Sequence, residues 1–366
     1  MSFNCGIVGL PNVGKSTLFN ALTATAAAQA ANFPFCTIEP NVGRVALPDE
    51  RLEKLAAIAG SEKILPTQME FVDIAGLVKG ASKGEGLGNQ FLANIRQTDA
   101  IIHVLRCFED SDITHVDGSV DPIRDADTIS TELMIADLES IEKQIEAIAR
   151  KAKNDKDAAA QHALMIKIKD TLDNGQPVRT VETKDEDEAK MLKQFGMLTA
   201  KPVLYVCNVS EDDAATGNAL TAKVADMAAS DNAQAVTICA SIESEIAQLD
   251  TKEEKAEFLE TIGLSESGLD KIIRAGFTLL NLQTYFTCGP KETRAWTIPI
   301  GATAPEAAGV IHTDFQKGFI KAETITFDDY ITCNGENGAK DSGKMRQEGK
   351  DYVVQDGDVI LFRFNV

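Results

Sequence analysis

Short apolar runs separated by polar stretches predict a mainly parallel β-sheet. The runs lie at residues 5–8, 69–72, 100–105, 202–207 and 236–240. Short runs of this kind, with little alternation between apolar and polar positions, are typical of strands buried within a parallel sheet. The pattern therefore predicts an α/β fold, with helices between the strands.

A helical period replaces this pattern between about residues 130 and 200. Apolar positions there recur in steps of four and three, the seam of a coiled coil, at Met134, Leu138, Ile141, Ile145 and Ile148. The run breaks at residues 154–156, and a second helical run ends at 174–177, where Asn, Gly and Pro give a stop signal. We expect an antiparallel helical arm inserted into the α/β domain.

From about residue 280 the chain changes character again. Strand-like runs at 296–299 and 324–327 flank a helical stretch at 304–309, which predicts a small α+β domain. The expected division is a P-loop domain at 1–129 and 201–279, an inserted arm at 130–200, and a C-terminal domain at 280–366.

Composition narrows the class of protein. The 366 residues are 44% hydrophobic and 25% charged, as in globular proteins with a substantial core. The formal net charge of −20 argues against coating nucleic acid through bulk charge, and we expect no DNA partner. Local basic faces that bind RNA are still possible. The candidate cations for them are Lys79, Lys83, Arg96, Arg106, Lys317, Lys321, Lys340, Lys344, Arg346 and Lys350. Interspersed acids make solvated surface the alternative.

Other features indicate a cytoplasmic protein. No run of eighteen apolar residues suggests a membrane span, and the N-terminal residues do not resemble a signal peptide. The seven cysteines include no C-x-x-C pair, which favours reduced thiols over disulfides or a zinc site.

The first candidate site is the stretch from Gly9 to Thr17, which fits G-x-x-x-x-G-K-[ST] between a strand and a helix. Glycines let the backbone N–H groups surround a phosphate, and the helix N-terminus adds positive potential. Lys15 is expected to reach the β- and γ-phosphates, and the Ser16 hydroxyl to ligate Mg²⁺.

Two further segments stand where the switches of a GTPase-type enzyme stand. Residues 32–40 form a loop with two prolines, in which Thr37 is assigned to Mg²⁺ and the γ-phosphate. Asp73 to Gly76 follows a strand as D-x-x-G, so Asp73 is assigned to Mg²⁺ and the Gly76 N–H to the γ-phosphate. Leu77 occupies the position of the water-orienting glutamine, so hydrolysis is slow or another group orients water.

One of two histidines near the strand at 100–105 is a candidate for that other group. His103 lies inside an apolar run and is interpreted as a core residue. His115 lies in a polar loop just after that strand, and we assign it a candidate catalytic role, with plain solvation as the alternative.

The base is expected to lie against Asn208 to Glu211. Guanine-specific enzymes carry Asn-Lys-x-Asp at this place, and their Asp accepts hydrogen bonds from guanine. In this sequence Val209 replaces the Lys and Glu211 replaces the Asp, which argues against strict GTP preference and favours ATP. Ser241 begins the loop expected to cover the base edge.

Taken together, residues 9–17, 32–40, 73–81 and 208–211 and the C-terminal domain resemble the YchF / Obg-like ATPase family. The resemblance implies a Ras-like P-loop domain, a helical insertion and a C-terminal TGS domain of the ubiquitin-like β-grasp type. It also implies Mg²⁺-dependent ATP hydrolysis, association with the ribosome and its RNA, and a hydrophobic residue such as Leu77 in place of glutamine.

The resemblance also assigns residues. It implies phosphate binding by Asn12, Val13, Gly14, Lys15, Ser16 and Thr17, with Ser16 and Thr37 on Mg²⁺ and with Asn208 and Glu211 at the base. Asn12 resembles the asparagine of P-loop enzymes that recruit K⁺ in place of an arginine finger. The alternatives are a GTP-specific switch and a slow or non-catalytic adaptor whose nucleotide is structural.

Overall fold

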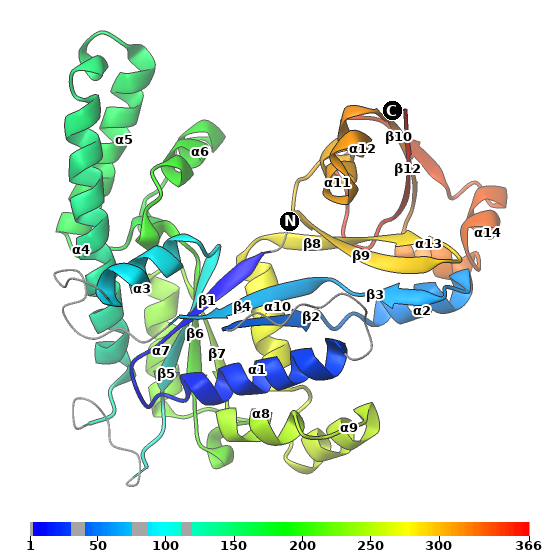
Figure 1. Cartoon of the computed structure of the whole chain (residues 1–366), viewed down its shortest axis with the longest axis horizontal. Helices are drawn as coiled ribbons and strands as arrows, with labels where there is room; N and C mark the ends of the chain where they lie inside the picture. The colour runs from blue at the N-terminus through cyan, green and yellow to red at the C-terminus, as the bar shows by residue number, and fades with distance from the viewer. Residues whose placement is uncertain (1–2, 31–40, 75–86, 111–118, 366) are drawn as a thin grey trace.

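The computed structural model describes residues 3–30, 41–74, 87–110 and 119–365. Two six-stranded sheets form its framework, and a long pair of helices extends away from the first sheet (Figure 1). Within these ranges no helix is both long enough and apolar enough to cross a bilayer.

The first sheet has the strand order β2-β4-β1-β5-β6-β7. Its pairings are all parallel except that of β2 with β4, which confirms the predicted α/β class with a mainly parallel sheet. Its strands are β1 (Asn4–Val8), β2 (Val42–Ala46), β4 (Gln68–Asp73), β5 (Ala100–Arg106), β6 (Val203–Asn208) and β7 (Gln234–Ile238).

Helices flank this sheet because its central strands are apolar on both faces: every residue of β5 and β6 is buried. Helix α1 packs against α8, and α7 packs against β6 and β7. The helices are α1 (Lys15–Ala30), α3 (Leu87–Arg96), α7 (Ala219–Ser230), α8 (Ala240–Ile246), α9 (Lys252–Thr261) and α10 (Gly268–Leu279).

The inserted arm consists of α4 (Pro122–Ile148) and α5 (Lys156–Asp173), followed by α6 (Glu186–Gln194). Three short 3₁₀ turns connect these parts: η2 (Lys151–Lys153), η3 (Val178–Thr180) and η4 (Leu198–Ala200). The predicted seam packs against α5, since Ile141 and its seam neighbours share one apolar cluster with Leu164, Met165, Ile168 and Leu172. The structure thus confirms a helical arm.

Helix α4 belongs to two cores at once. The heptad pattern predicts an arm from residue 130, but α4 starts at Pro122, where the Asp121 carboxylate accepts hydrogen bonds from the Ile123 and Arg124 N–H groups. Its first half packs into the core of the first sheet through Ala126, Ile129 and Leu133. The arm therefore begins as an extension of a core helix, which holds its root in place.

The second sheet has the order β11-β10-β12-β8-β9-β3. Its strands are β3 (Lys63–Leu65), β8 (Leu282–Cys288), β9 (Glu292–Pro299), β10 (Phe319–Ile325), β11 (Arg346–Glu348) and β12 (Val359–Phe364). Its helices are α11 (Ala304–Ile311), α12 (Thr313–Lys317), α13 (Phe327–Thr332) and α14 (Glu336–Asp341). Tyr285 and Phe286 lie in two different apolar clusters, so helices cover β8 on both sides.

One segment of the N-terminal third packs with this C-terminal sheet. Strand β3 pairs in parallel with β9, and α2 (Glu50–Ala59) buries Leu52 and Leu55 in the same cluster as Phe286. The expected division counted residues 1–129 as P-loop domain, whereas α2 and β3 complete the second sheet. The cause is the amphipathic pattern of α2, whose apolar side requires a partner that the first sheet does not supply.

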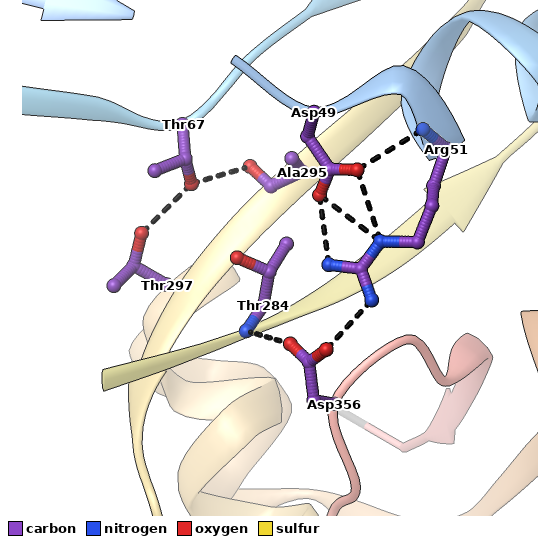
Figure 2. A network of polar contacts seen from close by, with 7 residues as sticks. All are labelled: Asp49, Arg51, Thr67, Thr284, Ala295, Thr297 and Asp356. Atoms are coloured by element: carbon purple, nitrogen blue, oxygen red, sulfur yellow. Dashed lines mark hydrogen bonds and ion pairs between the residues drawn. The ribbon is translucent and has the colours of Figure 1, made fainter. Parts of the chain in front are cut away.

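Polar contacts reinforce this junction (Figure 2). The Arg51 guanidinium pairs with Asp49 at 2.8 Å and with Asp356 at 2.6 Å, and Asp356 also accepts a hydrogen bond from the Thr284 N–H at 3.0 Å. The Thr67 and Thr297 hydroxyls are 2.7 Å apart. Residues far apart in sequence are therefore held by directional contacts as well as by apolar packing.

We expect Leu55→Ala to destabilise the C-terminal sheet. Leu55 is fully buried, and truncating a buried leucine costs about 2–5 kcal/mol. The single tryptophan, Trp296, lies on β9, so its fluorescence during urea unfolding reports on this sheet. The midpoint should fall for Leu55→Ala and stay unchanged for Lys54→Ala, whose side chain is 60% exposed on the same helix. An unchanged midpoint for Leu55→Ala contradicts the assignment of α2 to this sheet.

Candidate functional site

The G-x-x-x-x-G-K-[ST] stretch folds as a loop between β1 and α1. Asn12 and Gly14 have positive φ values of 63° and 93°, so the chain reverses direction here, and α1 begins at Lys15. Val13 is 1% exposed and anchors the loop in the core. Ser16 and Thr17 are exposed in the first turn of α1. This is the strand–loop–helix arrangement that a phosphate-binding loop needs.

Two predicted site residues meet directly. The Lys15 ammonium, at the start of α1, forms an ion pair with the Asp73 carboxylate, at the end of β4. The parallel register that pairs Ile7 with Asp73 brings the two ends together. Their side chains are 13% and 20% exposed, so a cation and an anion are concentrated at the mouth of the loop with little solvent around them.

Asn208 joins the loop to the other half of the sheet. Its side-chain amide donates to the Val13 carbonyl at 3.0 Å, and its oxygen accepts from the Ala240 N–H at 2.9 Å. It is 4% exposed. A Cβ on Gly14 would lie 2.2 Å from the Asn208 nitrogen, so only glycine fits here. The motif assigned Asn208 to the base, and these contacts give it a structural role as well.

Glu211 and Ser241 lie together beside Asn208. The Ser241 hydroxyl donates to the Glu211 carboxylate at 3.1 Å and lies 3.0 Å from the Cys239 sulfur. Both residues are exposed. The structure thus brings the end of β6 and the start of α8 to one edge, where a carboxylate and a hydroxyl face solvent.

Arg106 is a residue of this edge that sequence reasoning misplaced. It was counted among candidate surface cations, but it is 1% exposed. It lies beside Asn208 in the sheet register and donates to the carbonyls of Phe108 at 3.1 Å and Asp110 at 3.2 Å. Its role is to hold the turn after β5, and the signal that could have found it is its place at the end of an apolar strand.

The remaining assigned residues lie outside the described ranges or inside the core. Thr37, Gly76, Leu77 and His115 lie outside the described residues. His103 is 4% exposed on β5, and burial lowers its pKa to about 3, which keeps it neutral in the core. Where the structure describes the chain, no cluster of three or more His, Cys, Asp or Glu side chains suits a metal.

The loop, the Lys15–Asp73 pair and the Asn208 link define a P-loop nucleotide-binding protein with a GTPase-type sheet. A Haemophilus influenzae protein named ribosome-binding ATPase YchF is 60% identical over the full length of both chains. A Bacillus subtilis protein of the same name is 56% identical, again over both full lengths. The chain belongs to the YchF family.

Family models and a solved structure agree with this membership. A model described as 50S ribosome-binding GTPase matches residues 4–135, and the YchF GTPase C-terminal model, described as a protein of unknown function, matches 282–365. The solved Schizosaccharomyces pombe YchF GTPase has a TM-score of 0.89 and 38% identity, covering 99% of this chain and 98% of that one. These names differ on ATP and GTP, so the nucleotide has to be argued from the residues.

We expect Gly14→Ala to disrupt the loop. The new methyl group would displace the Asn208 amide, and breaking the buried amide contacts costs about 1–3 kcal/mol. The alanine would also have to adopt the unfavourable positive φ of this position. Gly175→Ala is the matched control, since φ is also positive, 71°, but nothing lies within 4 Å. It should cost about 1–2 kcal/mol from backbone strain alone. Equal losses of stability in chemical denaturation, with nucleotide binding retained in both variants, contradict the Asn208–Gly14 constraint.

Proposed function

We propose that this protein is an ATP-hydrolysing P-loop switch that associates with the ribosome in the cytoplasm. The observation that carries the proposal is the Lys15–Asp73 pair at the mouth of the loop. In P-loop enzymes a lysine at this place binds the phosphates and a carboxylate at this place binds the magnesium ion. The relatives' names, ribosome-binding ATPase, support the partner and the reaction. The proposed partners include ribosomal RNA and exclude membranes and DNA.

The donor set at the loop suits Mg²⁺. An exposed Ser16 hydroxyl and the Asp73 carboxylate are oxygen donors, which Mg²⁺ prefers, and Asp73 already lies beside the start of α1. Ser16 and Asp73, with Thr37, would hold the ion, which when bound offsets negative charge on the phosphate oxygens. Lys15, redirected from Asp73, binds phosphate with Asn12, Val13, Gly14 and Thr17.

Glu211 supports ATP as the preferred nucleotide. A carboxylate there can accept a hydrogen bond from the adenine amino group, and Ser241 orients it at 3.1 Å. The Lys that accompanies guanine recognition is replaced by Val209, which is 2% exposed and packs into the core. Asn208 holds this edge against the phosphate loop, so both ends of the nucleotide are positioned together.

For the chemical step we propose slow intrinsic hydrolysis. With Leu77 in place of the glutamine, water orientation falls to His115 or to a group of the ribosome, while the Gly76 N–H responds to the γ-phosphate. Asn12 is proposed to help hold a K⁺ ion that offsets transition-state charge. In this scheme the nucleotide state alters how the arm and the C-terminal domain meet the partner.

We expect Glu211→Ala to remove discrimination between ATP and GTP. Hydrogen bonds to charged groups contribute about 1.5–3 kcal/mol, so ATP affinity should fall about tenfold or more while phosphate binding is retained. Asp212→Ala is the control, because Asp212 is an exposed neighbour in the same turn, η5 (Glu211–Asp213). Competition binding with both nucleotides gives the affinity ratio. If wild type prefers GTP, the alternative of a GTP-specific switch is correct.

We expect ATP turnover to rise when purified ribosomes are added and to be lost in Lys15→Ala, because that variant lacks the phosphate-binding cation. Turnover that does not respond to ribosomes or to Lys15→Ala favours the nucleotide-gated adaptor. The same assay in potassium and in sodium buffers tests Asn12, since equal rates contradict the K⁺ proposal.

A further inference from the structure

The outer end of the arm carries a cluster of positive charge. Between the end of α4 and the first turn of α5, the chain places four cations and one acid in eight residues, 149–156, although the whole chain has a net charge of −20. We call these four cations the arm tip: Arg150, Lys151, Lys153 and Lys156. All four are exposed, and Figure 1 shows this end of α4 and α5 farthest from the two sheets.

The tip cations have little internal compensation. Among the described residues, only Lys151 of the four has an acid partner, Asp155 at 3.5 Å. Asp155 also caps α5, accepting hydrogen bonds from the Asp157 and Ala158 N–H groups at 2.9 and 3.1 Å. Its charge is therefore directed largely at the helix N-terminus. Arg150, Lys153 and Lys156 keep their charge available to an external anion.

The rest of the arm has the opposite character. Lys169 pairs with Glu142 at 3.1 Å and with Asp173 at 2.8 Å, and Lys184 pairs with Glu188 at 3.6 Å. Helix α6 adds acids such as Glu186, whose side chain is 93% exposed. A polyanion is thus attracted to the tip and repelled by the rest of the arm, from α4 to α6, which we call the shaft; this favours an end-on contact.

The chemistry of the tip suits phosphates better than a protein partner. Cores of protein interfaces are enriched in aromatic residues and Met and depleted in Lys. Between its cations the tip has only Ala152, Asn154 and Asp155, none of them a large apolar residue. The large apolar side chain exposed on the arm, Ile166, lies about 15 Å along α5 from Lys156. Lysine and arginine without apolar anchors are typical of contacts to a nucleic acid backbone.

We propose that the arm tip binds the phosphate backbone of ribosomal RNA end-on, a step that rests on the proposed association with the ribosome. The contact is sequence-independent, because flexible cations read charge and not base edges. It gives the arm a defined function: holding the nucleotide domain at a distance from the RNA surface set by the part of α4 beyond Leu133, which runs to Ile148 and spans about 22 Å.

The test compares three full-length proteins: wild type, a tip variant (Arg150→Gln, Lys153→Gln, Lys156→Gln) and a shaft variant (Lys184→Gln, Lys190→Gln, Lys193→Gln). Both variants lose three exposed cations from the arm. Binding to purified ribosomes, to a 20-base-pair RNA duplex and to polyglutamate is measured from about 50 to 200 mM salt, a range over which counterion release changes affinity strongly. Circular dichroism and thermal melting verify that each variant is folded.

The tip variant should bind ribosomes and the duplex about tenfold more weakly, and its slope of log affinity against log salt should fall by about 2, since each lost phosphate contact removes about 0.7–0.9. The shaft variant should keep the wild-type slope. Equal slopes for tip variant and wild type overturn the inference and leave the proposed function standing. If the tip variant binds polyglutamate more weakly but binds ribosomes and the duplex as tightly as wild type does, the choice of RNA as the partner is wrong. If the wild-type protein does not bind ribosomes, both the proposed ribosome association and this inference are wrong. The proposed ATPase activity is still tested separately, by measuring ATP turnover without ribosomes.

Discussion

The close approach of the Asn208 amide to Gly14 is the constraint on which the candidate site depends. One buried side chain joins the phosphate loop, through Val13, to the start of α8, through Ala240. A side chain at position 14 would break this link, because a Cβ there would lie 2.2 Å from the Asn208 nitrogen. The loop conformation is thus determined by the opposite half of the sheet as much as by its own glycines.

In the proposed nucleotide site, this constraint would hold the phosphate-binding end and the base-binding end in a fixed relation. The Lys15–Asp73 pair lies at the proposed phosphate end and the Glu211–Ser241 pair at the proposed base end, and Asn208 links the loop to the start of α8 between them. Arg106, the neighbour of Asn208 in the sheet, adds rigidity by donating hydrogen bonds to the carbonyl oxygens of the turn after β5. A preorganised edge of this kind loses little entropy on binding, which favours affinity without any large rearrangement of β5 or β6.

Sequence patterns were sufficient where a single local rule decides the structure. Continuous apolar runs predicted β5 and β6, a motif predicted the loop before Lys15, and the steps between Met134 and Ile148 predicted the arm. They were insufficient where the answer depends on distant partners. The apolar stripe of α2 shows that something covers Leu55 but not that Phe286 does. Arg106 reads as a surface cation until the carbonyls that bury it are known.

The path of the chain through both sheets has a consequence for how the protein is made. Helix α2 and strand β3 leave the exit tunnel early, but their partners, β8 and β9, come only after the arm and the remainder of the first domain. At about 5–20 residues per second, Leu52 and Leu55 stay unburied for roughly 10–50 s. The nascent chain therefore carries a helix with an uncovered apolar side for most of its translation, and chaperones that bind such surfaces have their longest opportunity there.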